Sequence, residues 1–94
     1  VLGLSRKPRP NFSSRGIWYD VAGQELHLIE TSDVPSRSEA HPAIEVRDIR
    51  AAVAICVAGG AELQQDTFVR THDNSLSAFI RDPDGNLLEL TQHL

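Results

Sequence analysis

The sequence predicts an α+β fold built from two similar units, and three features indicate it. Segments rich in β-branched and aromatic residues alternate with turn residues, as at 16–21 and 24–30. Residues 49–57 instead carry apolar side chains at i, i+3, i+4, i+7 and i+8, the spacing of an amphipathic helix. A hairpin pattern with Leu-X-Leu occurs at 23–30 and again 62 residues later, at 85–92. We therefore expect two βαβββ units that share one core.

The order of the expected elements follows from periodicity and from turn residues. The N-terminal segment, with Pro8 and Pro10, is expected to be extended or turning because two prolines exclude a helix. Asp48 is a suitable N-cap for the helix, and Gly59-Gly60 ends it. The order Asp-Pro-Asp-Gly at 82–85 predicts a tight turn. The strands are expected at 16–21, 24–30, 41–46, 61–65, 76–81 and 86–92, whereas 66–75 fits a polar loop or a weak strand.

Composition bounds the class of protein. A chain of 94 residues forms a single domain, which we expect to span 1–94. Nine basic against thirteen acidic residues give a net charge of −4, which argues against a nucleic-acid groove and against a polybasic membrane anchor. Cys56 lies on the apolar helix stripe, so we interpret it as a packed core thiol. One cysteine forms no internal disulfide, and we expect a cytoplasmic protein.

The repeat also indicates that the first unit is incomplete. The second half, 41–94, reads as strand, helix and then further strands, whereas 1–40 shows strands without a helix. His41 precedes Glu89 by 48 residues, and the same distance counted back from His27 falls before Val1. We therefore expect 41–94 to be a complete module and 1–40 to lack its opening strand and helix. A chain without methionine agrees with this expectation.

Three polar residues on predicted strands are candidates for a metal site. His27, His41 and Glu89 are each flanked by apolar residues, and an ionised carboxylate among leucines is costly without a partner or a metal. Two imidazoles and a carboxylate suit Zn(II), Ni(II), Mn(II), Fe(II) or Co(II). The alternative is that each residue lies on the solvated face of its strand.

The chain resembles a known family, the vicinal oxygen chelate superfamily. That superfamily holds glyoxalases, bleomycin-resistance proteins, fosfomycin-resistance enzymes and extradiol dioxygenases. The most specific segment is the last, from Phe79 through Asp-Pro-Asp-Gly-Asn to Leu90. The segments that carry the resemblance are 1–4, 16–28, 41–48 and 79–90, and the resemblance covers nearly the whole chain.

The resemblance implies paired βαβββ modules that form a cleft-like partial barrel around a divalent metal. It implies His27, His41 and Glu89 as metal ligands, with Glu89 also a catalytic residue, whereas the family's fourth ligand position is absent here. The implied function is a metal-dependent lyase, isomerase or dioxygenase acting on a small oxygen-rich substrate chelated to the metal. The alternative is a protein of bleomycin-resistance type that binds and sequesters an antibiotic or metabolite. Members of the family pair their modules, so we expect a homodimer.

Other residues near the site have more than one interpretation. A two-residue turn in the first hairpin places Trp18 opposite His27, whereas a bulged loop places Ile17 there. The second hairpin leaves the same choice between Phe79 and Ile80. We expect Trp18, Glu45 and Phe79 at the substrate cleft, where Trp18 belongs either to the core or to the cavity wall. Glu45 shares the face of His41 and is either a general base or a plain surface carboxylate, and His72 and His93 are expected to be solvated.

Overall fold

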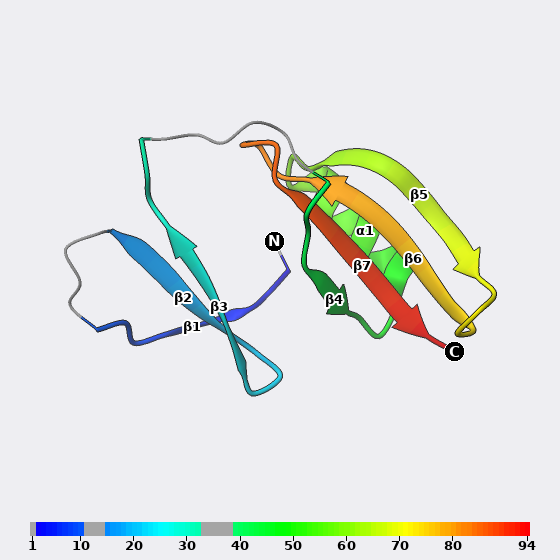
Figure 1. Cartoon of the computed structure of the whole chain (residues 1–94), viewed down its shortest axis with the longest axis horizontal. Coiled ribbons are helices and arrows are strands. Elements are labelled where there is room, and N and C mark those ends of the chain that lie inside the picture. Colours follow the sequence, from blue (N-terminus) through cyan, green and yellow to red (C-terminus); the bar gives the residue numbers. More distant parts are fainter. Residues whose placement is uncertain (1, 11–14, 33–38) are drawn as a thin grey trace. The chain divides into compact units, whose positions relative to one another are not determined.

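The computed structural model describes residues 2–10, 15–32 and 39–94. The described chain is α+β: its seven strands form two sheets, and it has one helix (Figure 1). It divides into two compact units. The N-terminal unit contains a three-stranded sheet, and the C-terminal unit contains a four-stranded sheet and the helix.

The N-terminal unit is an antiparallel sheet of β1 (Ser5–Lys7), β2 (Gly16–Val21) and β3 (Gln24–Ile29), in that order. The hairpin between β2 and β3 has the expected two-residue turn. Ala22 and Gly23 both adopt positive φ, 51° and 82°, as a turn that matches the twist of the strands requires. The sequence predicted β2 and β3 closely but did not single out β1 as a strand.

The C-terminal unit consists of β4 (Ala43–Glu45), α1 (Ile49–Ala58), β5 (Glu62–Arg70), β6 (Ser75–Arg81) and β7 (Leu87–His93). The strand order is β4-β7-β6-β5. β4 pairs with β7 in parallel, and the other neighbours are antiparallel. Figure 1 shows α1 lying along one face of this sheet.

The helix forms as its sequence predicts and provides half of the core. The side chain of Asp48 accepts a hydrogen bond from Ala51 N at 3.2 Å and so caps the first turn. Cys56 is buried on the inner face of α1, which confirms it as a core thiol, and burial raises its pKa. The core joins residues of α1, β6 and β7, namely Ile49, Val53, Cys56, Ala78, Ile80 and Leu90.

Alternation along β6 and β7 gives the sheet a second face with a different character. Ala78, Ile80 and Leu90 pack with α1, so their neighbours Phe79 and Glu89 point to the opposite face. The buried polar residues of the described chain, Ser75, Ser77, Arg81 and Glu89, all belong to that opposite face. A buried polar group needs a hydrogen-bond partner, so this face is where a functional network is expected.

Two expected elements differ from the structure. The strand expected at 41–46 is shorter, and His41 lies two residues before β4 rather than within it. The segment 66–75 was expected to be a polar loop or a weak strand; its residues 66–70 form one strand, β5, with most of the strand expected at 61–65, and 71–74 form the turn before β6. Register shifts between Leu63 and Phe68 break the alternation of β5 and explain why its pattern is weak.

The turn before β7 agrees with the sequence. Gly85 has a φ of 86°, and its N–H donates to the carbonyl of Asp82 at 2.9 Å.

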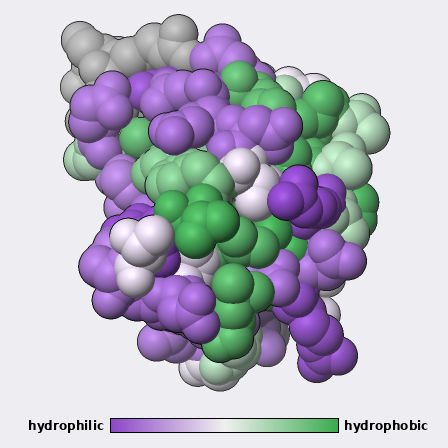
Figure 2. Space-filling model, turned by 90° about the vertical axis from the view of Figure 1, so that its right-hand side faces the viewer, coloured by the Kyte–Doolittle hydropathy of each residue, from purple (hydrophilic) through white to green (hydrophobic). Residues whose placement is uncertain are grey.

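In the described part of the chain, no helix is long and apolar enough to cross a membrane. On the face shown in Figure 2, hydrophobic and hydrophilic residues lie side by side. The exposed apolar residues of the C-terminal unit include Val69 and Leu94.

Candidate functional site

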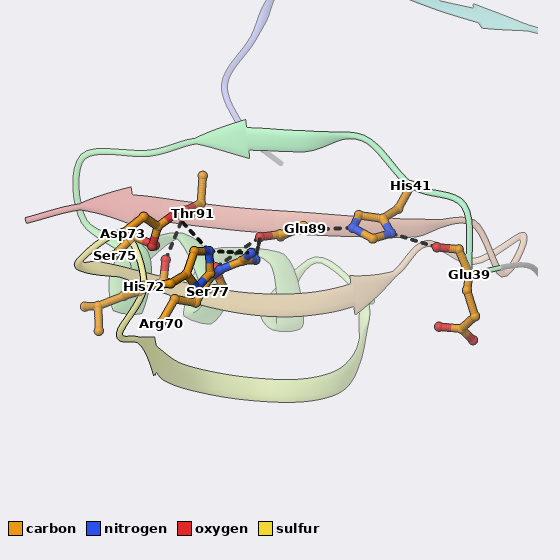
Figure 3. A network of polar contacts seen from close by, with 10 residues as sticks. Glu39, His41, Arg70, His72, Asp73, Ser75, Ser77, Glu89 and Thr91 are labelled. Carbon is orange, nitrogen blue, oxygen red and sulfur yellow. Dashed lines mark hydrogen bonds and ion pairs between the residues drawn. The ribbon is translucent and has the colours of Figure 1, made fainter.

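Glu89 and His41 form the centre of the polar network drawn in Figure 3. Glu89 lies on β7 opposite Ala43 of β4, and its N–H donates to the Pro42 carbonyl at 3.0 Å. This parallel pairing brings the residue before Pro42 alongside β7. Consequently His41 Nε2 lies 3.0 Å from Glu89 Oε1, although the two residues are 48 positions apart. The Glu89 side chain is only 9% exposed.

The other ring nitrogen of His41 is fixed by the backbone. His41 Nδ1 lies 2.7 Å from the carbonyl oxygen of Glu39. A carbonyl only accepts hydrogen bonds, so Nδ1 carries a proton and Nε2 is the nitrogen that faces Glu89. The Glu39 carbonyl and the Glu89 carboxylate both stabilise the imidazolium and raise the pKa of His41 above its ordinary value of 6.5.

The second carboxylate oxygen of Glu89 accepts hydrogen bonds from side chains on two other strands of the sheet, β5 and β6. Arg70 Nη1, on β5, donates to Oε2 at 2.9 Å, and Ser77 Oγ, on β6, donates to the same oxygen at 3.0 Å. Arg70 also lies 3.4 Å from Nε2 of His72, which is 67% exposed, as expected of a solvated residue. Glu89 is therefore a buried carboxylate with each oxygen engaged.

Aromatic side chains border this network. Phe79 is paired opposite Glu89 on β6, which decides the choice between Phe79 and Ile80. Its ring meets the His41 ring edge-on, with centroids 5.2 Å apart, and stacks with Phe68 at 6.1 Å. The placement beside His41 agrees with the expected role of Phe79 in a cleft wall, which stays a prediction.

His27 and Trp18 lie together in the N-terminal unit. Trp18 is paired opposite His27, which decides the choice between Trp18 and Ile17. The rings are stacked, with centroids 3.8 Å apart and planes within 3°. His27 Nε2 also lies 3.5 Å from Glu25 Oε1. The convergence of His27 with His41 and Glu89, and a place for Trp18 in the substrate cleft, stay predictions.

Glu45 is exposed on β4, where its register partner is Thr91 of β7. Ala43 lies two residues before Glu45, on the same side of β4, and it pairs with Glu89. Glu45 is therefore two residues along β4 from the position that pairs with Glu89. Its role as a general base stays a prediction. His93, the last residue of β7, is exposed as expected.

The His41–Glu89 pair fits a divalent metal in chemistry and in spacing. An imidazole nitrogen and a carboxylate oxygen that each bind a metal at about 2.0–2.2 Å lie about 3 Å apart when they meet it at a right angle. A histidine that binds a metal through one ring nitrogen usually donates a hydrogen bond from the other nitrogen, and a backbone carbonyl is a common acceptor. Among the residues that the structure describes, no group of three or more His, Cys, Asp or Glu side chains is close enough to hold a metal. A complete site therefore needs a further ligand beyond this pair.

Sequence reasoning missed Arg70, Ser77 and the backbone carbonyl of Glu39. Ser77 had a short signal, because serines alternate with apolar residues from Ser75 to Ala78. A buried polar side chain on the Glu89 face follows from that alternation. Arg70 had none, because its place depends on the pairing of the irregular strand β5.

Comparison with known proteins identifies the family. The family model of the glyoxalase-like domain matches residues 1–91, so the chain belongs to the glyoxalase-like domain family. This places it in the vicinal oxygen chelate superfamily, as its sequence indicated. No curated protein matches the sequence.

Solved structures agree on the fold. A glyoxalase family protein from Bacillus anthracis is 25% identical with a TM-score of 0.81, over 99% of this chain and 75% of that one. The fosfomycin resistance protein FosX from Listeria monocytogenes, as a variant in complex with Mn(II) and 1S,2S-dihydroxypropylphosphonic acid, is 17% identical with a TM-score of 0.79, over 100% and 76% of the two chains. TioX from Micromonospora sp. ML1 is 22% identical with a TM-score of 0.74, over 100% and 82%.

Proposed function

We propose that the protein is a metal-dependent enzyme that acts on a small, oxygen-rich molecule chelated to a divalent metal. His41, Glu89 and His27 would hold the metal, which is one of Zn(II), Ni(II), Mn(II), Fe(II) or Co(II). The observation that carries the proposal is the 3.0 Å separation of His41 Nε2 and Glu89 Oε1 within a mostly buried network. A carboxylate and an imidazole at this spacing are suitable neighbouring ligands.

The chemistry that such a metal supplies is that of a Lewis acid, which stabilises negative charge on substrate oxygens. The residues of this chain would prepare the site for it. The Glu39 carbonyl orients the imidazole of His41, and Arg70 and Ser77 hold the carboxylate of Glu89. The ring of Phe79 packs against the ring of His41 in a T-shaped contact and would help to hold the imidazole in place. Isomerase, lyase and ring-cleavage reactions that pass through an enolate-like or oxyanion charge would all use this stabilisation.

The similarity to FosX supports the proposal at the level of the fold. That protein was solved with Mn(II) and a ligand that carries two neighbouring hydroxyl groups. At 17% identity the likeness shows the fold alone, so the metal site rests on the residues of this chain.

A second candidate function is the binding and sequestration of a small antibiotic or metabolite without catalysis. The stacked aromatic pairs favour it, because Phe68 with Phe79 and Trp18 with His27 provide planar aromatic surfaces. The two functions differ in their need for a metal. A sequestering protein need not hold a metal, whereas the proposed enzyme loses activity when the metal is removed.

Metal retention tests the proposed function. After loading with each of the five metals and extensive dialysis, elemental analysis should find about one metal per chain in the wild type for at least one of them. Glu89→Ala should abolish retention and His27→Ala should reduce it less, because Glu89 is the only anionic ligand. Glu30→Ala, which removes an exposed carboxylate ion-paired to Arg15 at 3.2 Å, is the matched control and should retain the metal. Equal retention by the wild type and Glu89→Ala would contradict the assignment.

A further inference from the structure

The two carboxylate oxygens of Glu89 have different surroundings. Oε1 faces Nε2 of His41 at 3.0 Å. Oε2 accepts hydrogen bonds from Arg70 Nη1 at 2.9 Å and from Ser77 Oγ at 3.0 Å. Figure 3 shows His41 on one side of the Glu89 carboxylate and Arg70 with Ser77 on the other. The carboxylate is therefore held from one side and presented to His41 on the other.

The supports of Oε2 are themselves held in place. Ser77 is fully buried in the middle of β6, between β5 and β7. Arg70 lies at the end of β5, where its guanidinium contacts Glu89 through Nη1 and His72 through Nη2. A guanidinium with contacts at two of its nitrogens has little freedom to turn away from the carboxylate.

This asymmetry decides how Glu89 can bind a metal. A carboxylate binds a metal through one oxygen or through both, and an oxygen that already accepts two hydrogen bonds from fixed donors is not free to turn toward a metal. Oε1 is paired instead with His41 Nε2, and a metal that replaces the proton between these two atoms would bind to both. A ligand that takes one position instead of two leaves more positions for substrate oxygens.

We propose that Ser77 and Arg70 are positioning residues that restrict Glu89 to metal binding through Oε1. The inference rests on the proposed function, because it assigns roles to residues around the same metal. Neither residue touches the metal; both act through the carboxylate.

Ser77→Ala is the most direct variant because it removes one donor to Oε2 without changing any charge. Ser75→Ala is a matched control. Both serines are fully buried on β6, two residues apart, but Ser75 Oγ donates to Asp73 at 2.6 Å and not to Glu89. The two substitutions remove the same atoms from the same strand, so they differ in the group that loses its hydrogen bond.

The measurements are the affinity for Co(II), by calorimetry, and the visible absorption spectrum of the Co(II) protein, which reports the geometry around the metal. Ser77→Ala should weaken Co(II) binding about tenfold, the lower end of the effect of removing an outer partner of a metal ligand. It should also change the spectrum, because Oε2 then keeps only the Arg70 hydrogen bond of the two and turns more readily toward the metal. Ser75→Ala should keep the affinity and the spectrum of the wild type. Circular dichroism establishes that each variant is folded.

Arg70→Gln is an independent second variant, and its spectrum should change as well. Its affinity carries less information, because loss of the guanidinium also removes a charge that repels the metal. If Ser77→Ala and Arg70→Gln both keep the spectrum of the wild type, and Ser77→Ala also keeps its affinity, the positioning role is overturned. The proposed function is not affected by that result. Absence of Co(II) binding by the wild type, together with absence of retention of the other metals, would overturn the proposed function and the inference with it.

Discussion

The protonation of His41 links the candidate site to the stability of the protein. Its pKa is raised above 6.5 in the folded protein by the Glu39 carbonyl and the Glu89 carboxylate, whereas the unfolded chain has the ordinary value. The favourable contribution of the imidazolium is therefore fully present below the unfolded pKa and is lost as pH rises through the folded pKa.

In the metal-free protein, we expect the free energy of unfolding to fall as pH rises from about 6.5 through the folded pKa of His41. Urea denaturation at several pH values, in the presence of a chelator, measures this slope. His41→Gln should remove it, and His93→Gln, at the exposed end of β7, should not. An NMR titration that finds the pKa of His41 at or below 6.5 would contradict the described hydrogen bonds.

Cys56 provides a second test at the residue scale. Its side chain is buried among core residues, and burial raises the pKa of its thiol. The thiolate is the reactive form, so the folded protein should react slowly with a disulfide reagent such as DTNB. The reaction should accelerate through the urea unfolding transition, and rapid reaction in the absence of urea would show that the helix does not pack as described.

The start of α1 is the clearest test at the scale of elements. Asp48 accepts a hydrogen bond from Ala51 N and caps the helix. Asp48→Ala should lower the free energy of unfolding by about 1 kcal/mol, the usual cost of losing an N-cap. Arg50→Ala, on the exposed side of the same helix, should change it by less than about 0.5 kcal/mol. Similar effects of the two substitutions in urea denaturation would contradict the capping role.

The elements that could be predicted from sequence are those with local signals. The helix has its stripe and caps, and the hairpin of β2 and β3 has its two-residue turn. β5 was harder because its bulges break the period of two on which strand prediction depends. β1 is three residues long and is defined by its pairing with β2, which is not a local property.

The candidate site was predictable only in part, for the same reason. Glu89 stands out locally, because it lies between leucines on a strand that follows a clear turn. His41 lies just before its strand, and its approach to Glu89 depends on the parallel pairing of β4 with β7. Arg70 reaches Glu89 from β5, two strands away in the sheet, and no spacing in the sequence indicates that contact.

At the scale of the whole molecule, we expect a homodimer. Within the described chain, β3 is an edge strand, and Leu28 and Ile29 on it are 51% and 62% exposed. An edge strand with exposed apolar residues is open to pairing or coverage by another chain. Size-exclusion chromatography with light scattering should give twice the mass of one chain, and the interface should bury more than about 1,000 Å² in total. A stable, soluble monomer at micromolar concentration would contradict this expectation.

Anomalous X-ray diffraction from crystals loaded with Mn(II), Co(II) or Zn(II) would show whether His27, His41 and Glu89 bind one metal. We expect one strong anomalous peak at about 2.0–2.2 Å from His41 Nε2, from Glu89 Oε1 and from a ring nitrogen of His27. A loaded crystal in which the His41–Glu89 pair keeps its direct 3.0 Å contact, with no peak beside it, would contradict the proposed metal site.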